Sequence, residues 1–157
     1  LERVQVDTIP GMWIWGIGGA VGAFGIGRVL DKVDSSRKLT TIIIVFLAAD
    51  FALLLLFPSS RMVALVCLFA WGLLGWSSMA PQQHSMLSAN PDEGATAVAA
   101  NASANYLGSA VGSAVGGLFL PSSTGILLGA LFVVLLGIVC SIGARALSFL
   151  KPRDYEN

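Results

Sequence analysis

The feature that most constrains the fold is a long stretch without charge: between Glu93 and Arg145 the sequence contains no charged residue. Soluble domains carry about 25% charged residues, whereas this 157-residue chain carries only 11%. A bilayer core about 30 Å thick is crossed by roughly 20 apolar residues in a helix. The uncharged stretch therefore has room for two membrane-spanning helices, with LPSST at residues 120–124 as the turn between them.

The same criterion predicts five spans in the whole chain. They are residues 9–30, 39–57, 62–82, 94–120 and 125–147. The segments between them are short: the charged stretch that ends at Lys38, then PSSR, HSMLSANPDEG and PSST. Runs such as LLGALFVVLLGIV do not alternate as barrel strands do, and backbone groups in lipid must be paired within their own segment. We therefore expect an all-α integral membrane fold.

The distribution of Lys and Arg predicts the orientation in the membrane. Five spans place the two termini on opposite sides. Seven basic residues then lie on one side and two on the other: Arg28, Lys32, Arg37, Lys38, Arg145, Lys151 and Arg153 against Arg3 and Arg61. Cytoplasmic loops are enriched in Lys and Arg. We therefore expect the first loop and the C-terminus to be cytoplasmic.

The charged stretch GRVLDKVDSSRK, at residues 27–38, resembles the loop signature of the major facilitator superfamily. That signature is a glycine, three residues, an aspartate and a basic residue, then a glycine and two basic residues. It recurs after the second and the eighth helix of these twelve-helix carriers. The matching residues are Gly27, Asp31, Lys32, Arg37 and Lys38, and the second glycine is replaced by a longer VDSS segment.

A second, broader resemblance covers residues 80–117, APQQHSMLSANPDEGATAVAANASANYLGSAVGSAVGG. This stretch is similar to the tenth and eleventh helices of the superfamily's bacterial drug and sugar efflux branch. The resemblance implies that the five spans are helices eight to twelve, most of one six-helix half. The N-terminal half of the carrier would then lie in a longer protein, which is consistent with a chain that begins at Leu1.

The resemblance implies a secondary active transporter in the bacterial inner membrane, an antiporter that exports small organic solutes by alternating access with proton coupling. Its partners would be the lipid bilayer, the missing N-terminal half and a small-molecule substrate, and no cofactor is implied. The alternative is a non-transporting membrane subunit that packs through glycine-rich helix faces. An intramembrane enzyme is a more distant third.

The loop supports two interpretations. In the first it is a conformational gate, since Asp31 can cap a neighbouring helix or pair with Arg37 in one state of a carrier and release that contact in the other. In the second it is a topology signal only. The gate residues are Gly27, Arg28, Asp31, Lys32, Arg37 and Lys38.

The predicted fourth span presents a face of small residues. Gly108, Gly112 and Gly116 recur every four residues, which lets helix backbones approach closely. The same face continues back to Asn105 and Asn101. By resemblance these two amides line the substrate cavity; the alternative is hydrogen bonding between helices.

Two further positions, Trp71 and Asp50, each leave two interpretations open. Trp71, in the third span, either stacks on substrate or packs against neighbouring helices, and Gly18 and Gly22 in the first span favour helix packing. Asp50 is the one acidic residue within a predicted span. A charge there costs roughly 2.5–3.5 kcal/mol, so Asp50 is either a proton-coupling site or the structural partner of a polar group on an adjacent helix.

Other classes of function find little support. His84 has no second ligand or triad partner in the sequence, and we expect an interfacial polar role. Cys67 and Cys140 lie in apolar runs without metal or redox spacing, which is typical of small buried side chains. A formal net charge of zero gives no field for nucleic acid. We therefore expect no enzyme, no metal site and no nucleic-acid partner.

Overall fold

The computed structural model of the protein describes residues 7–89, 91–118 and 123–150. Within these ranges the chain is helical, with short connections and no strand. The helices are α1 (Thr8–Leu30), α2 (Ser36–Leu56), α3 (Arg61–Ser77), α4 (Met79–Ala89), α5 (Gly94–Leu118) and α6 (Ser123–Leu150). The predicted all-α class is confirmed.

Serine residues begin two of the long helices. The Ser35 hydroxyl accepts a hydrogen bond from the backbone N–H of Lys38 at 3.4 Å, so α2 begins at Ser36, three residues before the predicted span. The Ser60 hydroxyl accepts in the same way from Val63 and begins α3. Each hydroxyl satisfies one of the N–H groups that a helix leaves unpaired at its start.

The region of the predicted third span contains two helices. A break at Ser78 separates α3 from α4, and α4 continues to Ala89. The interpretation of HSMLSA as a connecting segment is therefore wrong, because these residues form the second half of α4. Pro81 lies in the first turn of α4, where proline is tolerated because the N–H groups there lack intrahelical acceptors.

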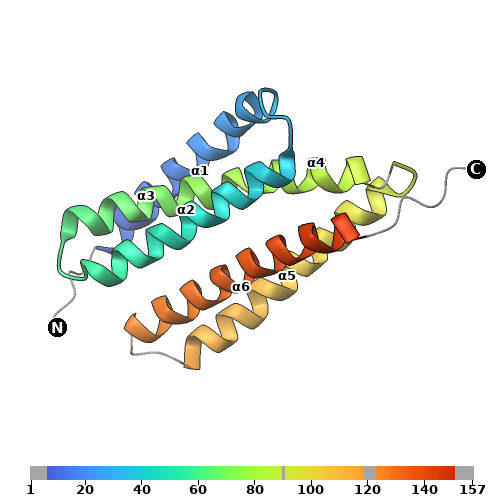
Figure 1. Ribbon diagram of the computed structural model, residues 1–157. Helices are drawn as coiled ribbons and strands as arrows, with labels where there is room; N and C mark the ends of the chain where they lie inside the picture. The colour runs from blue at the N-terminus through green and yellow to red at the C-terminus, as the bar shows by residue number, and fades with distance from the viewer. Residues whose placement is uncertain (1–6, 90, 119–122, 151–157) are drawn as a thin grey trace, which may run out of the picture.

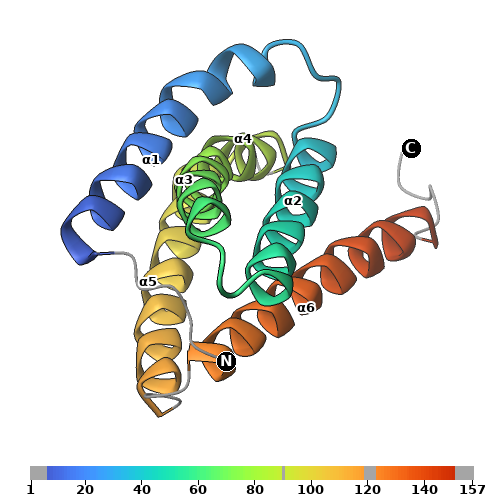
Figure 2. The same cartoon turned by 90° about the vertical axis from the view of Figure 1, so that its left-hand side faces the viewer.

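The long helices run up and down, with α3 between α1 and α2 (Figures 1 and 2). The α1–α2 and α4–α5 connections lie at one end of the molecule, and the α2–α3 connection lies at the other end. We call the first of these the loop end. A small buried cluster of Ile26, Leu39 and Ile43 joins α1 to α2, with Leu74 and Ala80 packed against it.

The last two helices pack more loosely. α6 lies along α2, whereas α5 contacts α4 near its own beginning. From their connected ends α5 and α6 diverge, as Figure 2 shows. The part of α5 beyond its first turns therefore has few neighbours among the described residues, and nearly all its side chains there are exposed.

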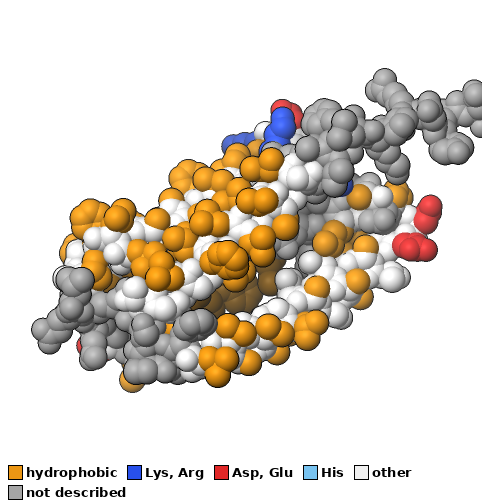
Figure 3. All heavy atoms as spheres, turned by 60° about the horizontal axis from the view of Figure 1, so that its bottom comes forward, with side chains coloured by type: hydrophobic (Ala, Val, Ile, Leu, Met, Phe, Trp, Pro, Cys, Tyr) orange, Lys and Arg blue, Asp and Glu red, His pale blue; other side chains and the backbone are white. Residues whose placement is uncertain are grey.

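The surface has the character of a membrane protein. Three helical segments of the described chain are long and apolar enough to cross a bilayer: Ile9–Leu30, Ser36–Leu56 and Arg61–Ala89. The apolar segment of α6, Thr124–Cys140, is shorter. Apolar side chains cover much of the face in Figure 3, whereas charged side chains gather towards the loop end. Phe24 is 84% exposed and Phe132 is 67% exposed, which suits contact with lipid rather than water. The fold is that of an integral membrane protein.

Candidate functional site

The charged loop joins α1 to α2 in a tight turn. The backbone N–H of Asp31 donates to the carbonyl of Gly27 at 3.1 Å, and that of Lys32 donates to Val29 at 3.0 Å. Two consecutive turns of this kind close the end of α1 and turn the chain towards Ser35. The loop therefore presents a compact charged surface rather than an extended strand.

The predicted gate residues come together at the loop end, and all six residues are exposed: Gly27, Arg28, Asp31, Lys32, Arg37 and Lys38. Within the described part of the chain, the Asp31 carboxylate forms no ion pair and caps no helix. A Cβ at Gly27 would meet no atom within 4 Å. This surface of the loop is therefore open, and whether it acts as a gate stays a prediction.

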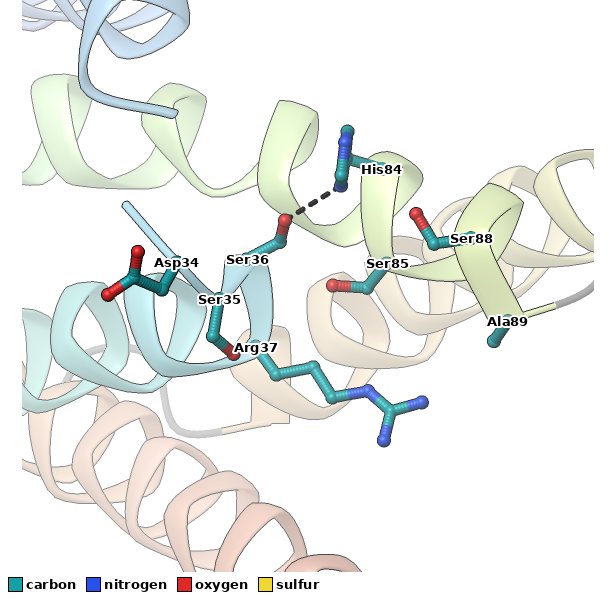
Figure 4. A pocket seen from close by; sticks show the side chains of 8 residues that line it. All are labelled: Asp34, Ser35, Ser36, Arg37, His84, Ser85, Ser88 and Ala89. Carbon is teal, nitrogen blue, oxygen red and sulfur yellow. Dashed lines mark hydrogen bonds between the residues drawn. The ribbon is translucent and has the colours of Figure 1, made fainter. Parts of the chain in front are cut away.

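Beside the loop, a polar cavity of about 290 Å³ lies between the first turn of α2 and the second half of α4. Figure 4 shows its lining residues, which include Asp34, Ser36, His84 and Ser85. The Ser36 hydroxyl and Nδ1 of His84 are hydrogen-bonded at 2.7 Å across it. His84 therefore has a specific partner, which sequence reasoning missed because 47 residues of apolar helix and turn separate it from Ser36.

Asp50 lies at the interface of α2 and α3, where it is 8% exposed. Its carboxyl is hydrogen-bonded to the thiol of Cys67, a residue that is 1% exposed. The second carboxyl oxygen, Oδ2, is buried without a hydrogen-bond partner among the described residues. Ionisation of this carboxyl would leave an unpaired charge away from water, which is strongly unfavourable.

Trp71 belongs to a chain of aromatic rings that joins three helices. Its ring lies 6.1 Å from the ring of Phe51 on α2 and 6.1 Å from that of Trp15 on α1. Trp15 in turn lies 6.3 Å from Trp76. These separations are typical of favourable tilted and edge-to-face pairs. Trp71 therefore packs against both neighbouring helices, although 42% of the residue remains exposed. Its place in the substrate cavity stays a prediction.

The glycines of α1 allow its backbone to touch that of α3. A Cβ at Gly18 would collide with the carbonyl of Phe69, and one at Gly22 would collide with the carbonyl of Leu73. From the other side, a Cβ at Gly72 would collide with the carbonyl of Trp15. Gly72 was not among the predicted packing residues, and its place in AWGLLGW carries no spacing that singles it out from Gly75.

The small-residue face of α5 has a different setting. A Cβ at Gly108, Gly112 or Gly116 would meet no atom within 4 Å. Asn101 is half-buried and Asn105 is exposed. Neither amide makes a hydrogen bond within the described part of the chain. The structure therefore brings these five residues onto one open helix face, apart from Trp71 and Asp50.

The family described as Major Facilitator Superfamily matches residues 5–113, which include α1 to α4 and most of α5. The chain belongs to the major facilitator superfamily. Members of this superfamily are membrane transporters, so the all-α fold, the apolar surface and the membership agree. No solved structure matches the chain.

Most of the residues described above lie within the part of the chain that matches the major facilitator superfamily. The matched region contains the charged loop, the Asp50–Cys67 pair, the aromatic chain and both asparagines of α5. Among the described residues, no group of three or more His, Cys, Asp or Glu side chains is placed to hold a metal ion. The residues present are those of a helical transporter, with polar groups at one end and on one open face.

Proposed function

We propose that this chain is the C-terminal portion, helices eight to twelve, of a secondary active transporter that exports small organic solutes in exchange for protons. The carrying observation is the superfamily match over residues 5–113, joined to a charged loop at the end of α1 whose glycine and aspartate have the superfamily's spacing. Transport would follow alternating access, in which the two halves of the carrier rock about a central site.

The arrangement of the loops supports the proposed orientation. Arg28, Lys32, Arg37 and Lys38 lie at the loop end, and Arg61 begins α3 at the opposite end. Under the positive-inside rule the loop end is cytoplasmic. The C-terminus is then cytoplasmic as well, in a bacterial inner membrane.

The proposed gate is the exposed loop surface around Asp31. Its carboxylate has no ionic partner among the described residues and is therefore free to bind a helix end or a basic side chain of the other half. A contact of this kind, made in one state and broken in the other, biases the equilibrium between the states. Exposed ion pairs contribute about 0–1 kcal/mol each, which is enough to alter the populations of two nearly balanced states.

The proposed substrate cavity lies along the open face of α5. Asn101 and Asn105 can donate and accept hydrogen bonds to a polar solute. Beyond them, Gly108, Gly112 and Gly116 leave room for the backbone of a helix from the N-terminal half. The partners proposed for this face are therefore the missing half of the carrier and a small-molecule substrate.

The open face of α5 also favours a second candidate, a membrane subunit that packs on another protein without transporting. The two candidates differ in the length of the native protein. A gene product near four hundred residues with seven further spans supports the carrier. A protein of five spans that assembles with a different chain supports the subunit.

The deciding experiment is a proton-coupled efflux assay on the full-length protein in inverted membrane vesicles, with a panel of dyes, drugs and sugars. Substrate-dependent loss of the pH gradient that disappears in Asp31→Asn supports the carrier and the gate together. Efflux that survives Asp31→Asn leaves the carrier and reduces the loop to a topology signal. No proton movement with any solute contradicts proton-coupled export.

A further inference from the structure

The hydrogen bond between Ser36 and His84 connects two parts of the molecule that few other polar contacts join. Ser36 is the first residue of α2 and follows directly on the charged loop. His84 lies on α4, on the far side of the break at Ser78. The bond at 2.7 Å therefore ties the end of the loop to the segment beyond the break.

Because of the break at Ser78, the Ser36–His84 hydrogen bond can affect the angle between α3 and α4. α3 is held to α1 by backbone contacts at Gly18, Gly22 and Gly72, which leave no room for sliding. α4 continues from α3 across the break at Ser78, and its first turn packs against α1 and α2 through Ala80. Its far end carries α5, which packs on it where Gly94 meets Leu87. A change in the angle between α3 and α4 would move the open face of α5 relative to the rigid α1–α3 pair.

The space around the bond allows such a change. The cavity of about 290 Å³ lies beside the bond, between the first turn of α2 and the second half of α4, so the packing of the two helices is incomplete there. Ser85, also on its lining, has a buried hydroxyl without a hydrogen-bond partner among the described residues. In Figure 4 the Ser36 and His84 side chains point towards one another while Ser88 lies further along α4.

We propose that Ser36 and His84 form a latch: a pair of positioning residues whose hydrogen bond holds α4 against the start of α2 in this conformation and opens in the alternate one. The proposal rests on the proposed transport cycle and adds residues to it that lie outside the superfamily-like loop signature. Neither residue contacts substrate. Their effect is on the ratio of the two conformations.

The test measures that ratio directly. Spin labels are placed at exposed Val33 in the loop before α2 and exposed Ala89 at the end of α4. The protein is the full-length carrier with Cys140→Ser, in lipid nanodiscs. A hydrogen bond contributes about 0.5–1.5 kcal/mol net, so its loss alters a two-state ratio by about two- to tenfold. We expect Ser36→Ala and His84→Phe each to raise the population at the longer distance by that factor.

Four further variants separate a latch from general damage. The double variant Ser36→Ala/His84→Phe should show no larger shift than either single variant, since both remove the same bond. Ser36→Thr and His84→Asn keep a hydroxyl and a hydrogen-bonding side chain, and should restore the original ratio. Ser88→Ala, which removes another hydroxyl from the same cavity lining, is the matched control and should leave the ratio unchanged.

Several results would overturn the proposal. These are an unchanged ratio in both single variants, shifts that add in the double variant, or a lower melting temperature with an unaltered ratio. The measurement needs no substrate, so it separates the two proposals. Transport with an unaltered distance distribution contradicts the latch alone, whereas a shifted distribution in a protein that transports nothing contradicts the proposed function.

Discussion

The carboxyl of Asp50 on α2 meets the thiol of Cys67 on α3 at the interface of the two helices, and both residues are almost completely buried. The one acidic side chain in the predicted spans therefore has a neighbour on an adjacent helix rather than an open path to water. The contact with Cys67 favours a structural role for Asp50 over a role in proton coupling. The variant Asp50→Asn distinguishes the two roles.

Asp50→Asn should retain proton-driven transport in the full-length protein. The amide has the shape of the neutral acid and can still interact with Cys67, so the α2–α3 interface is preserved. The measurement is substrate-dependent proton movement in inverted vesicles. If coupling is lost while binding of the substrate persists, Asp50 is the coupling site and the structural interpretation is wrong.

Gly72→Ala should destabilise the protein by about 1–3 kcal/mol, the usual cost of forcing extra atoms into a close contact. The new Cβ would collide with the carbonyl of Trp15, and this backbone has no flexible end that can move away. Thermal melting in detergent measures the effect. The matched control is Gly75→Ala on the same helix, where a Cβ meets nothing within 4 Å. Equal melting temperatures for the two variants would contradict the backbone contact.

Gly112→Leu should reduce transport by the full-length carrier by about tenfold, because the proposed partner helix cannot approach a branched side chain on this face. Gly117→Leu is the control, since Gly117 lies on a different face of α5 and also has open space around it. Efflux rates of both variants at equal amounts in the membrane give the comparison. An equal reduction of the efflux rate in both variants would show that α5 accepts a large side chain on neither face. The proposal that the Gly112 face packs against a partner helix would then lose its support.

Trp71→Leu should lower stability by about 1–3 kcal/mol, the sum of two aromatic pairs at about 0.5–1.5 kcal/mol each. It should leave the KM for transport unchanged, because the ring is engaged by Trp15 and Phe51. Trp13→Leu provides the control, as Trp13 is 69% exposed on α1. A raised KM at unchanged melting temperature would instead place Trp71 in the substrate cavity.

Much of the helical layout follows from charge and length alone. The predicted starts and ends of the first two spans lie within three residues of α1 and α2, because charged or capping residues bound long apolar runs there. The third span shows the limit of that argument. Length and hydropathy do not reveal a break at Ser78. The polar residues after Gln82 continue as helix to Ala89, because no proline or glycine lies between Gln82 and Pro91.

The site was less predictable than the helices. Glycine spacing identified Gly18 and Gly22 as candidates for packing and Gly108, Gly112 and Gly116 equally so, yet the structure gives only the first group a contact within the described chain. Spacing reports which residues share a face, whereas the partner of that face depends on tertiary arrangement. The Ser36–His84 and Asp50–Cys67 pairs were missed for the same reason, since each joins residues on different helices.

The backbone contact between α1 and α3 also has a consequence for the order of assembly. The two helices are not neighbours in the sequence, so α1 must enter the bilayer before its principal partner has been synthesised. Glycine contacts suit this delay, because they leave no side chain to be immobilised when the late helix arrives. The pairing of Gly18 and Gly22 with α3 is then a step in membrane insertion that α2 must not obstruct, and the glycine face of α1 stays without this partner until α3 is released.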